Sequence, residues 1–272
     1  MVKLIALDLD ETLLDKDSQL SPRNRKAMER AQAMGAELVI ATGRAYDTIP
    51  AEMLTFPGIR YAITGNGAAV YDVRTGEAVR RQVLPQDAPR QVRGAMAGLD
   101  VAYEIFWQGR AYAQADYLRR LDKYMMDGHR QDYVQKTRRP VEDLRQFVEA
   151  HAAELDSMAV IPADLPTRKE ALARLRALEG VYVTTSHIRL IEVNHRDSTK
   201  ASALRYLAKG LHVAQSDTAA FGNGDNDAEM LAWAGIGVSV AEGTALCRAS
   251  ADWVTGSYDA DGAGEALERM FP

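Results

Sequence analysis

The sequence predicts an α/β fold in which a doubly wound, mostly parallel sheet is interrupted by an inserted α+β domain. Three observations lead to this prediction. Short apolar strands in the first third of the chain end in polar loops, and the same pattern returns after residue 188. The middle of the chain instead alternates helical and strand-like stretches, with no acid-rich strand end like the first. We therefore expect residues 1–83 and 188–272 to form one core, with residues 84–187 inserted into it.

The first strand and helix are the clearest elements. Residues 3–9 form a nearly continuous apolar run that ends in acids, which is typical of a buried parallel strand. Ser21-Pro22 then predicts a helix start, with an N-cap followed by proline in the first turn. An apolar face at helical spacing follows, made of Ala27, Met28, Ala31 and Met34. Gly35 is a suitable helix stop.

Two further strands end in polar loops. Residues 37–41 run into Thr42-Gly43-Arg44, and residues 61–64 run into Gly65-Asn66-Gly67. Ligands of open α/β sheets bind at the carboxyl ends of the strands. If these strands are parallel, Asp8, Asp10, Thr42, Arg44 and Asn66 lie along one edge of the sheet.

The remaining elements divide between the two expected domains. In the inserted region, strand-like runs cover residues 101–107, 158–161 and 181–185. In the last third, which we expect to rejoin the core, we predict strands over 188–193, 218–221 and 236–240 and helices over 199–209 and 229–234. The strand at 218–221 runs directly into the segment Gly-Asn-Gly-Asp-Asn-Asp.

Composition narrows the class of protein. The 272-residue chain has a formal net charge of −5 and a pI of about 5.6, so a nucleic-acid partner is not expected. The single cysteine, Cys247, allows no internal disulfide and fits a reducing compartment. Acids interrupt the first apolar run, and no run approaches the ~20 apolar residues of a membrane span. We therefore expect a cytoplasmic protein without a membrane partner; its oligomeric state is not readable from sequence.

The segment Asp8-Leu9-Asp10-Glu11-Thr12 carries the strongest chemical signal. Two carboxylates two residues apart, directly after a buried strand, can both face one crevice, where their repulsion favours a divalent cation with oxygen ligands. One carboxylate can then act as a nucleophile and the other as a general acid and base. The alternative is a strand followed by an acidic turn with caps.

Together with three later segments, this one resembles the haloacid dehalogenase superfamily, in particular its Cof-type branch with a large α/β cap. Asp8 to Leu13 match the first motif and Thr42 to Arg44 the second. Lys200 matches the third, and the segment 222–227 followed by Met230-Leu231 matches the fourth. The resemblance implies a Rossmann-like core, a cap in the gap between the second and third motifs, and phosphatase activity.

The resemblance also implies roles for single residues. Asp8 is then the nucleophile, Asp10 the general acid and base, Thr42 a hydrogen-bond donor to a phosphoryl oxygen, and Lys200 a cation that neutralises phosphate and holds Asp8. The expected Mg²⁺ ligands are Asp8, Asp10 through its backbone carbonyl, Asn223 and Asp227. The expected substrate-binding residues are Thr42, Gly43, Arg44, Asn66, Lys200 and Asn226.

The expected substrate is a small phosphate ester, such as a sugar phosphate, a nucleotide, flavin mononucleotide or pyridoxal phosphate. The cap would contact its non-phosphate part, with candidate contacts at Tyr103, Trp107, Tyr112, Tyr182 and His187. Basic residues at Lys123, Arg130 and 136–139 can favour anions or simply face solvent.

Two positions depart from the family pattern. Asn223 stands where the family usually has aspartate, and Glu11 where glycine is common. Asn223 keeps a second class of function open, a noncatalytic regulatory protein on a phosphatase scaffold. A phosphotransferase or mutase using the same aspartyl-phosphate is the third alternative.

Overall fold

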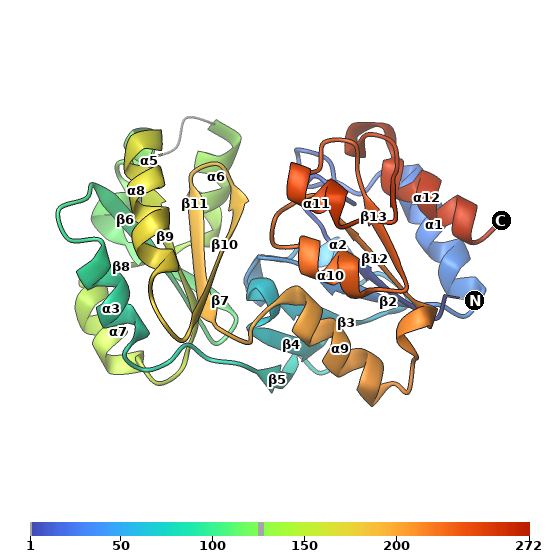
Figure 1. Ribbon diagram of the computed structural model, residues 1–272, viewed down its shortest axis with the longest axis horizontal. Helices are drawn as coiled ribbons and strands as arrows, with labels where there is room; N and C mark the ends of the chain where they lie inside the picture. Colours follow the sequence, from blue (N-terminus) through green and yellow to red (C-terminus); the bar gives the residue numbers. More distant parts are fainter. Residues whose placement is uncertain (1, 125–127) are drawn as a thin grey trace. The chain divides into compact units, whose positions relative to one another are not determined.

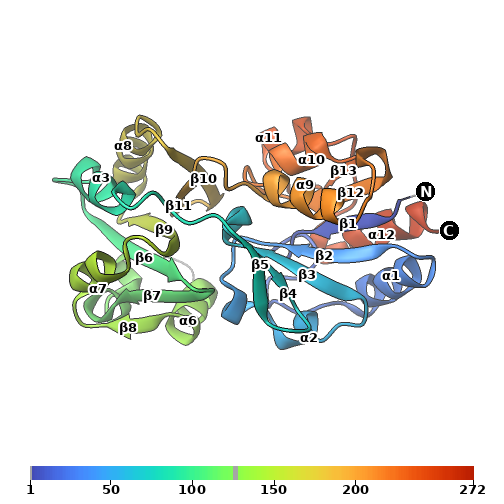
Figure 2. The same ribbon diagram turned by 90° about the horizontal axis from the view of Figure 1, so that it is seen from below.

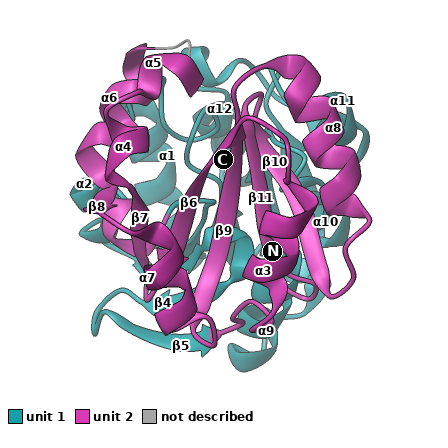
Figure 3. Cartoon of the chain, turned by 90° about the vertical axis from the view of Figure 1, so that its left-hand side faces the viewer, with its two compact units in different colours: residues 1–44, 49–80, 199–272 teal, residues 45–48, 81–198 magenta. Residues whose placement is uncertain are grey.

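The computed structural model describes residues 2–124 and 128–272 and divides the chain into two compact units (Figure 3). Unit 1 comprises Met1–Arg44, Ile49–Arg80 and Thr199–Pro272, and unit 2 comprises Ala45–Thr48 and Arg81–Ser198. The chain therefore enters unit 2 twice, first for the four residues that follow Arg44.

Unit 1 is built on an eight-stranded sheet of order β14-β13-β12-β1-β2-β3-β4-β5 (Figure 1). Its strands are β1 (Leu4–Leu7), β2 (Glu37–Ala41), β3 (Ile59–Thr64), β4 (Ala69–Asp72), β5 (Glu77–Arg81), β12 (Thr218–Gly222), β13 (Ile236–Ser239) and β14 (Trp253–Val254). The strands from β14 to β3 are parallel to their neighbours, whereas β4 returns antiparallel to β3. The predicted α/β class, with a parallel-sheet core, is confirmed.

Helices cover both faces of this sheet. They are α1 (Pro22–Ala33), α2 (Ala51–Leu54), α9 (Lys200–Gly210), α10 (Ala228–Trp233), α11 (Ala245–Ala249) and α12 (Gly262–Met270). Figure 2 shows α9 and α10 on one face and α1 on the other, and α1 packs with α12. Side chains on both faces of β1 are fully buried, which explains its unbroken apolar sequence.

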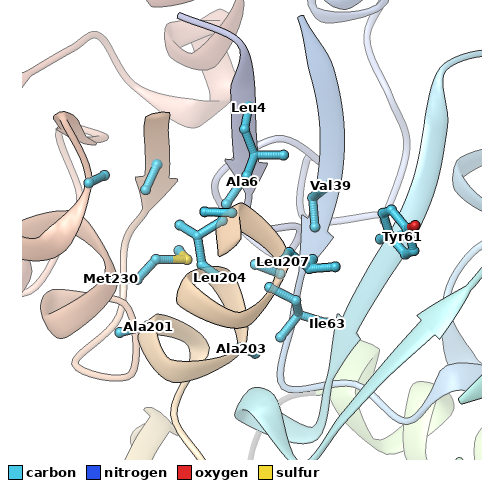
Figure 4. Close-up of a cluster of buried hydrophobic side chains, with 14 of the residues drawn as sticks. Leu4, Ala6, Val39, Tyr61, Ile63, Ala201, Ala203, Leu204, Leu207 and Met230 are labelled. Carbon is cyan, nitrogen blue, oxygen red and sulfur yellow. The ribbon is translucent and has the colours of Figure 1, made fainter. Parts of the chain in front are cut away.

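One apolar cluster lies between the sheet and α9 with α10 (Figure 4). Leu4 and Ala6 of β1 and Val39 of β2 meet Leu204 and Leu207 of α9 there. Burial of such side chains stabilises a fold by about 1.5–3 kcal/mol each. This cluster fixes α9, and with it Lys200 at the first turn of the helix, against the strands that carry the acids.

Sequence signals for helix ends act as predicted. The side chain of Ser21 accepts a hydrogen bond from the backbone N–H of Asn24 at 3.1 Å, with Pro22 in the first turn. Gly35, at φ +92°, follows the end of α1. For α9, Thr199 and Ser202 form a reciprocal capping box.

Unit 2 contains a six-stranded mixed sheet of order β10-β11-β9-β6-β7-β8. Its strands are β6 (Val101–Trp107), β7 (Arg110–Gln114), β8 (Arg139–Val141), β9 (Leu155–Pro162), β10 (Val181–His187) and β11 (Leu190–His195). Its helices are α3 (Ala88–Ala95), α4 (Ala115–Leu118), α5 (Leu121–Tyr124), α6 (Gly128–Thr137), α7 (Leu144–His151) and α8 (Leu165–Arg176). Separate apolar clusters line the two faces of the sheet. No helix that the structure describes is both long and apolar enough to cross a membrane.

One strand lies in a different sheet from the one expected. Residues 188–193 were predicted to rejoin the core, but β11 pairs antiparallel with β9 and β10, and unit 2 extends to Ser198. The apolar pattern of Leu190, Ile191 and Val193 correctly indicates a buried strand. The pattern carries no information about the pairing partner, because either sheet can bury the same side chains.

Candidate active site

The site residues lie at the carboxyl ends of four neighbouring parallel strands in unit 1. Asp8 follows β1, Thr42 follows β2, the loop 65–67 follows β3, and the loop 223–227 follows β12. The chain runs from β1 to β2 on one side, whereas β12 lies on the other side of β1. Asp8 and Asp10 therefore lie at the switch point of a doubly wound sheet, where such folds bind their ligands.

A buried lysine joins two of these loops. Lys200 Nζ donates to Asp8 Oδ1 at 2.7 Å and to Asp227 Oδ1 at 2.6 Å. The side chains of Lys200 and Asp227 are fully buried, and that of Asp8 is 7% exposed. Three residues that are far apart in sequence thus form one charged cluster inside unit 1.

The cluster holds more negative than positive charge. Burial raises the pKa of Asp8 to about 7, and the charge of Asp227 adds to this rise, while Lys200 opposes it. Burial alone would lower the pKa of Lys200, but the charges of Asp227 and Asp8 outweigh burial and raise it. When Asp8 is ionised, one lysine between two carboxylates leaves an excess negative charge, which a cation can neutralise.

Asp227 organises the loop after β12. Its Oδ2 accepts hydrogen bonds from the backbone N–H groups of Asn223 at 3.0 Å and Gly224 at 2.9 Å, while Oδ1 faces Lys200. A Cβ at Gly222 would lie 2.4 Å from the Cβ of Asp227, so this turn requires glycine. Both oxygens of Asp227 are therefore engaged within the protein. Its role as a metal ligand stays a prediction.

Asp10 is held by an arginine from the second predicted motif. Arg44 Nε donates to Asp10 Oδ2 at 2.9 Å and to Oδ1 at 3.2 Å, and Nη2 also donates to Oδ1. Nη2 further donates to Ser18 Oγ at 2.7 Å. The backbone N–H of Arg44 donates to Thr42 Oγ1 at 3.1 Å, which orients the buried threonine hydroxyl beside Gly43.

The predicted asparagines also meet. Asn226 Nδ2 donates to Asn66 Oδ1 at 2.9 Å, and both side chains are buried. Asn66 has φ +56°, a left-handed conformation that asparagine adopts more readily than most residues. At Gly67, a Cβ would lie 2.2 Å from the carbonyl oxygen of Thr199, so the loop after β3 touches the start of α9.

The donor set fits a hard divalent cation. Asn223 Nδ2 donates to the backbone carbonyl of Asp10 at 3.3 Å, so the Asn223 amide lies beside a second oxygen ligand. Turning that amide over would place two oxygens side by side, an arrangement that a cation can bridge. Within residues 2–124 and 128–272, no group of three or more His, Cys, Asp or Glu side chains is arranged to hold a metal ion. The fit therefore depends on Asp8 together with carbonyl-type oxygens.

Sequence reasoning missed Ser18 as a residue of the site. Its neighbours form a polar turn, in which Asp15 Oδ1 accepts from the backbone N–H groups of Asp17 and Gln19. That composition predicts a turn. It does not indicate that the Ser18 hydroxyl meets Arg44.

Two of the candidate substrate contacts in unit 2 pack within it. Trp107 and Tyr112 have ring centroids 6.0 Å apart, and the tilted rings of Tyr112 and Phe147 have centroids 4.7 Å apart. Lys123 pairs with Asp100 at 2.6 Å. These side chains therefore have structural partners within unit 2, and Tyr182 and His187 of β10 are partly exposed.

Comparison with known proteins gives consistent matches along the chain. Residues 5–267 match the family model described as haloacid dehalogenase-like hydrolase. The phosphatase YwpJ of Bacillus subtilis is 27% identical, with 99% of this chain and 100% of the relative covered. The 5-amino-6-(5-phospho-D-ribitylamino)uracil phosphatase YcsE of the same organism is 26% identical, with 98% and 94% covered. A solved haloacid dehalogenase-like hydrolase from B. subtilis superposes with a TM-score of 0.85 at 25% identity, covering 99% of this chain and 100% of that chain.

Proposed function

The chain belongs to the haloacid dehalogenase-like hydrolases and is a phosphatase of that family, and from this premise we propose that it is a Mg²⁺-dependent enzyme that moves the phosphoryl group of a small metabolite first to Asp8 and then to water. The observation that carries the proposal is the buried contact of Lys200 with Asp8 at the switch point of the sheet. It fixes one oxygen of a carboxylate at the place where the fold binds ligands.

In the first step, Asp8 attacks phosphorus, a bond forms between phosphorus and the Asp8 oxygen, and the bond to the ester oxygen breaks. Asp10 gives a proton to the departing oxygen. In the second step, Asp10 takes a proton from water, which attacks phosphorus and releases phosphate from Asp8. The reaction consumes one water and restores both carboxyl groups.

Charge stabilisation is the main task of the remaining groups, because phosphoryl transfer depends on positioning and electrostatics. Lys200 supplies a buried positive charge. The Thr42 oxygen already accepts an N–H from the backbone of Arg44, so its hydroxyl hydrogen can be donated to a phosphoryl oxygen. When bound, Mg²⁺ supplies further positive charge to the phosphoryl oxygens. Asp8, the carbonyl of Asp10 and Asn223 would hold it, and Asp227 would support the loop that carries Asn223.

The rest of the proposed site surrounds the leaving group. We assign substrate contacts to Gly43, Arg44, Asn66 and Asn226, and recognition of the non-phosphate part to unit 2 as the cap. The substrate class is a small phosphorylated metabolite, and the named relatives make a phosphorylated ribityl compound the first candidate to test. A cytoplasmic location belongs to the same proposal, supported by the single buried Cys247.

The test is phosphate release from a panel of small phosphomonoesters with and without Mg²⁺. Wild type should turn over at least one ester only with the metal, and Asp8→Asn should fall to background. Asp10→Asn should lose about 10²–10⁴-fold, the usual range of general acid and base help. Asp225→Asn, on the same loop as Asn223, is the matched control and should retain activity.

Product analysis separates the alternatives. Turnover in ¹⁸O-water should place the label in released phosphate. An isomerised sugar phosphate without free phosphate would show a mutase instead. Silence of the wild type across the panel, with restored activity in Asn223→Asp, would refute the hydrolase proposal and favour a regulatory protein.

A further inference from the structure

The arginine of the second motif lies against a carboxylate. The Arg44 side chain is 8% exposed, whereas that of Asp10 is 51% exposed. Two guanidinium nitrogens of Arg44 donate to both oxygens of Asp10. Such a bidentate pair fixes the direction of a carboxylate as well as its charge, because the planar guanidinium matches it on two atoms.

Ser18 holds the other side of the arginine. Its hydroxyl accepts from Arg44 Nη2 at 2.7 Å, so one nitrogen contacts Asp10 and Ser18 together. Ser18 has φ +58°, a conformation that is uncommon for serine and that clusters at functional sites. The turn is held by hydrogen bonds to Asp15, including one from the backbone N–H of Ser18 to its carbonyl at 3.0 Å.

The backbone on the other side of Arg44 is also fixed. Its N–H donates to Thr42 Oγ1, and its carbonyl accepts from the N–H of Gly65 at 3.0 Å. The guanidinium therefore extends from a rigid loop to Asp10 and Ser18. A side chain held in this way can orient the Asp10 carboxylate.

We propose that Arg44 and Ser18 are positioning residues for Asp10, and that Arg44 acts on the reaction chiefly by aiming the Asp10 carboxyl at the leaving-group oxygen. The inference rests on the proposed function, in which Asp10 protonates that oxygen. It gives Arg44, expected above only as a substrate contact, a role as a support for proton transfer, and it adds Ser18 to the site.

The two roles of Arg44 predict different dependence on the leaving group. An alkyl phosphate needs a proton on its departing oxygen, whereas p-nitrophenyl phosphate releases a stable anion and needs little acid help. The ratio of kcat/KM for these two esters therefore reports the Asp10 acid step separately from phosphate binding. The ratio is suitable because kcat/KM covers only the steps up to formation of the phosphoryl-enzyme.

The experiment measures that ratio for wild type, Asp10→Asn, Arg44→Gln, Arg44→Lys and Ser18→Ala, with Arg60→Gln on β3 as the control. Asp10→Asn should lose about 10²–10⁴-fold on the alkyl ester and much less on the aryl ester. Arg44→Gln should follow the same pattern, and Arg44→Lys should not rescue it, because an ammonium cannot pair with two oxygens in one plane. Ser18→Ala should lose about 2–10-fold on the alkyl ester, the equivalent of one hydrogen bond.

Equal losses on both esters, with a raised KM, would show that Arg44 binds phosphate and would overturn the inference. If Arg44→Gln does not fold, Ser18→Ala decides by the same ratio. If wild type hydrolyses no ester of the phosphate panel, the proposed function fails and this inference fails with it.

A readout without turnover tests the pairing itself. In ¹⁵N-labelled protein, the Arg44 Nε–H signal, which arises from the group that donates to both oxygens of Asp10, should be protected from exchange with water and should lose that protection in Asp10→Ala. Retention of that protection in Asp10→Ala would overturn the inference even if the enzyme is active.

Discussion

Removing the Asp227 side chain should strongly destabilise unit 1. The side chain is fully buried, its Oδ1 contacts Lys200 at 2.6 Å, and its Oδ2 accepts two backbone N–H groups at 3.0 and 2.9 Å. Asp227→Ala deletes all three contacts at once. Lys200 then keeps Asp8 as its charged partner, and the loop after β12 loses its central acceptor.

The magnitude follows from the cost of each broken contact. Removing one partner of a buried ion pair costs about 3–5 kcal/mol, and a buried N–H left without an acceptor costs about 1–3 kcal/mol. These costs are not additive, since water can enter the space and Asp8 remains beside Lys200. We therefore expect the free energy of unfolding to fall by about 4 kcal/mol. Asp227→Asn should cost less, because its amide oxygen can still accept the two N–H groups.

The assay is urea unfolding of metal-free protein at pH 7, followed by circular dichroism, with the slope against urea checked for constancy. Asp225→Asn, two residues earlier and half-buried, is the control and should change the free energy of unfolding by less than about 1 kcal/mol. A loss in Asp227→Ala no larger than that in the control would refute the reasoning, because it would mean that the buried triad does not hold unit 1 together.

Three further predictions concern the same site. First, the folded-state pKa of Asp8, about 7, lies above the ordinary value of 3.8, so the stability that Asp8 contributes is complete below pH 3.8 and is lost as the pH rises towards 7. Metal-free wild type should therefore lose stability relative to Asp8→Asn over that interval, by at most about 1.4 kcal/mol per pH unit, and parallel curves from urea titrations would contradict this. Second, Gly67→Ala should cost more than Gly35→Ala in thermal melts, since both glycines have positive φ but only at Gly67 would the Cβ meet backbone, 2.2 Å from Thr199. Third, Asn223→Asp should tighten Mg²⁺ binding about tenfold by calorimetry, because a carboxylate replaces a neutral amide, and an unchanged affinity would exclude position 223 from the metal site.

Much of the core could be predicted because its elements are locally encoded. The apolar run of β1 shows burial on both faces, Ser21-Pro22 marks the start of α1 by its side chains, and Gly35 marks its end by a positive φ. The meeting of Asp8 with Lys200 is implied by the order of the motifs alone. The rule for the carboxyl ends of parallel strands does not place Lys200, because the strand before it, β11, lies in the sheet of unit 2.

Other features depend on partners that a single sequence does not reveal. The pairing of β11 with β9 depends on which apolar surface lies nearest in the fold, and the same apolar sequence would suit a strand in either sheet. The Asp10–Arg44–Ser18 contact is similar. From sequence alone, Asp10 is explained as part of an acidic turn, Arg44 as a residue at a strand end and Ser18 as a turn residue. Only the tertiary fold shows that they meet.

The neutral residue at position 223 can be understood from the charges around it. Asp227 has both oxygens engaged, and the Lys200 cluster already carries one carboxylate more than it has cations. A carboxylate at 223 would lie beside the Asp10 carbonyl and add repulsion to this region whenever no cation is bound. Asparagine avoids that repulsion and still offers an oxygen of the right chemistry. Under the proposed function, asparagine in place of aspartate would lower Mg²⁺ affinity and favour the metal-free fold, and catalysis would proceed at Mg²⁺ concentrations that fill the weaker site.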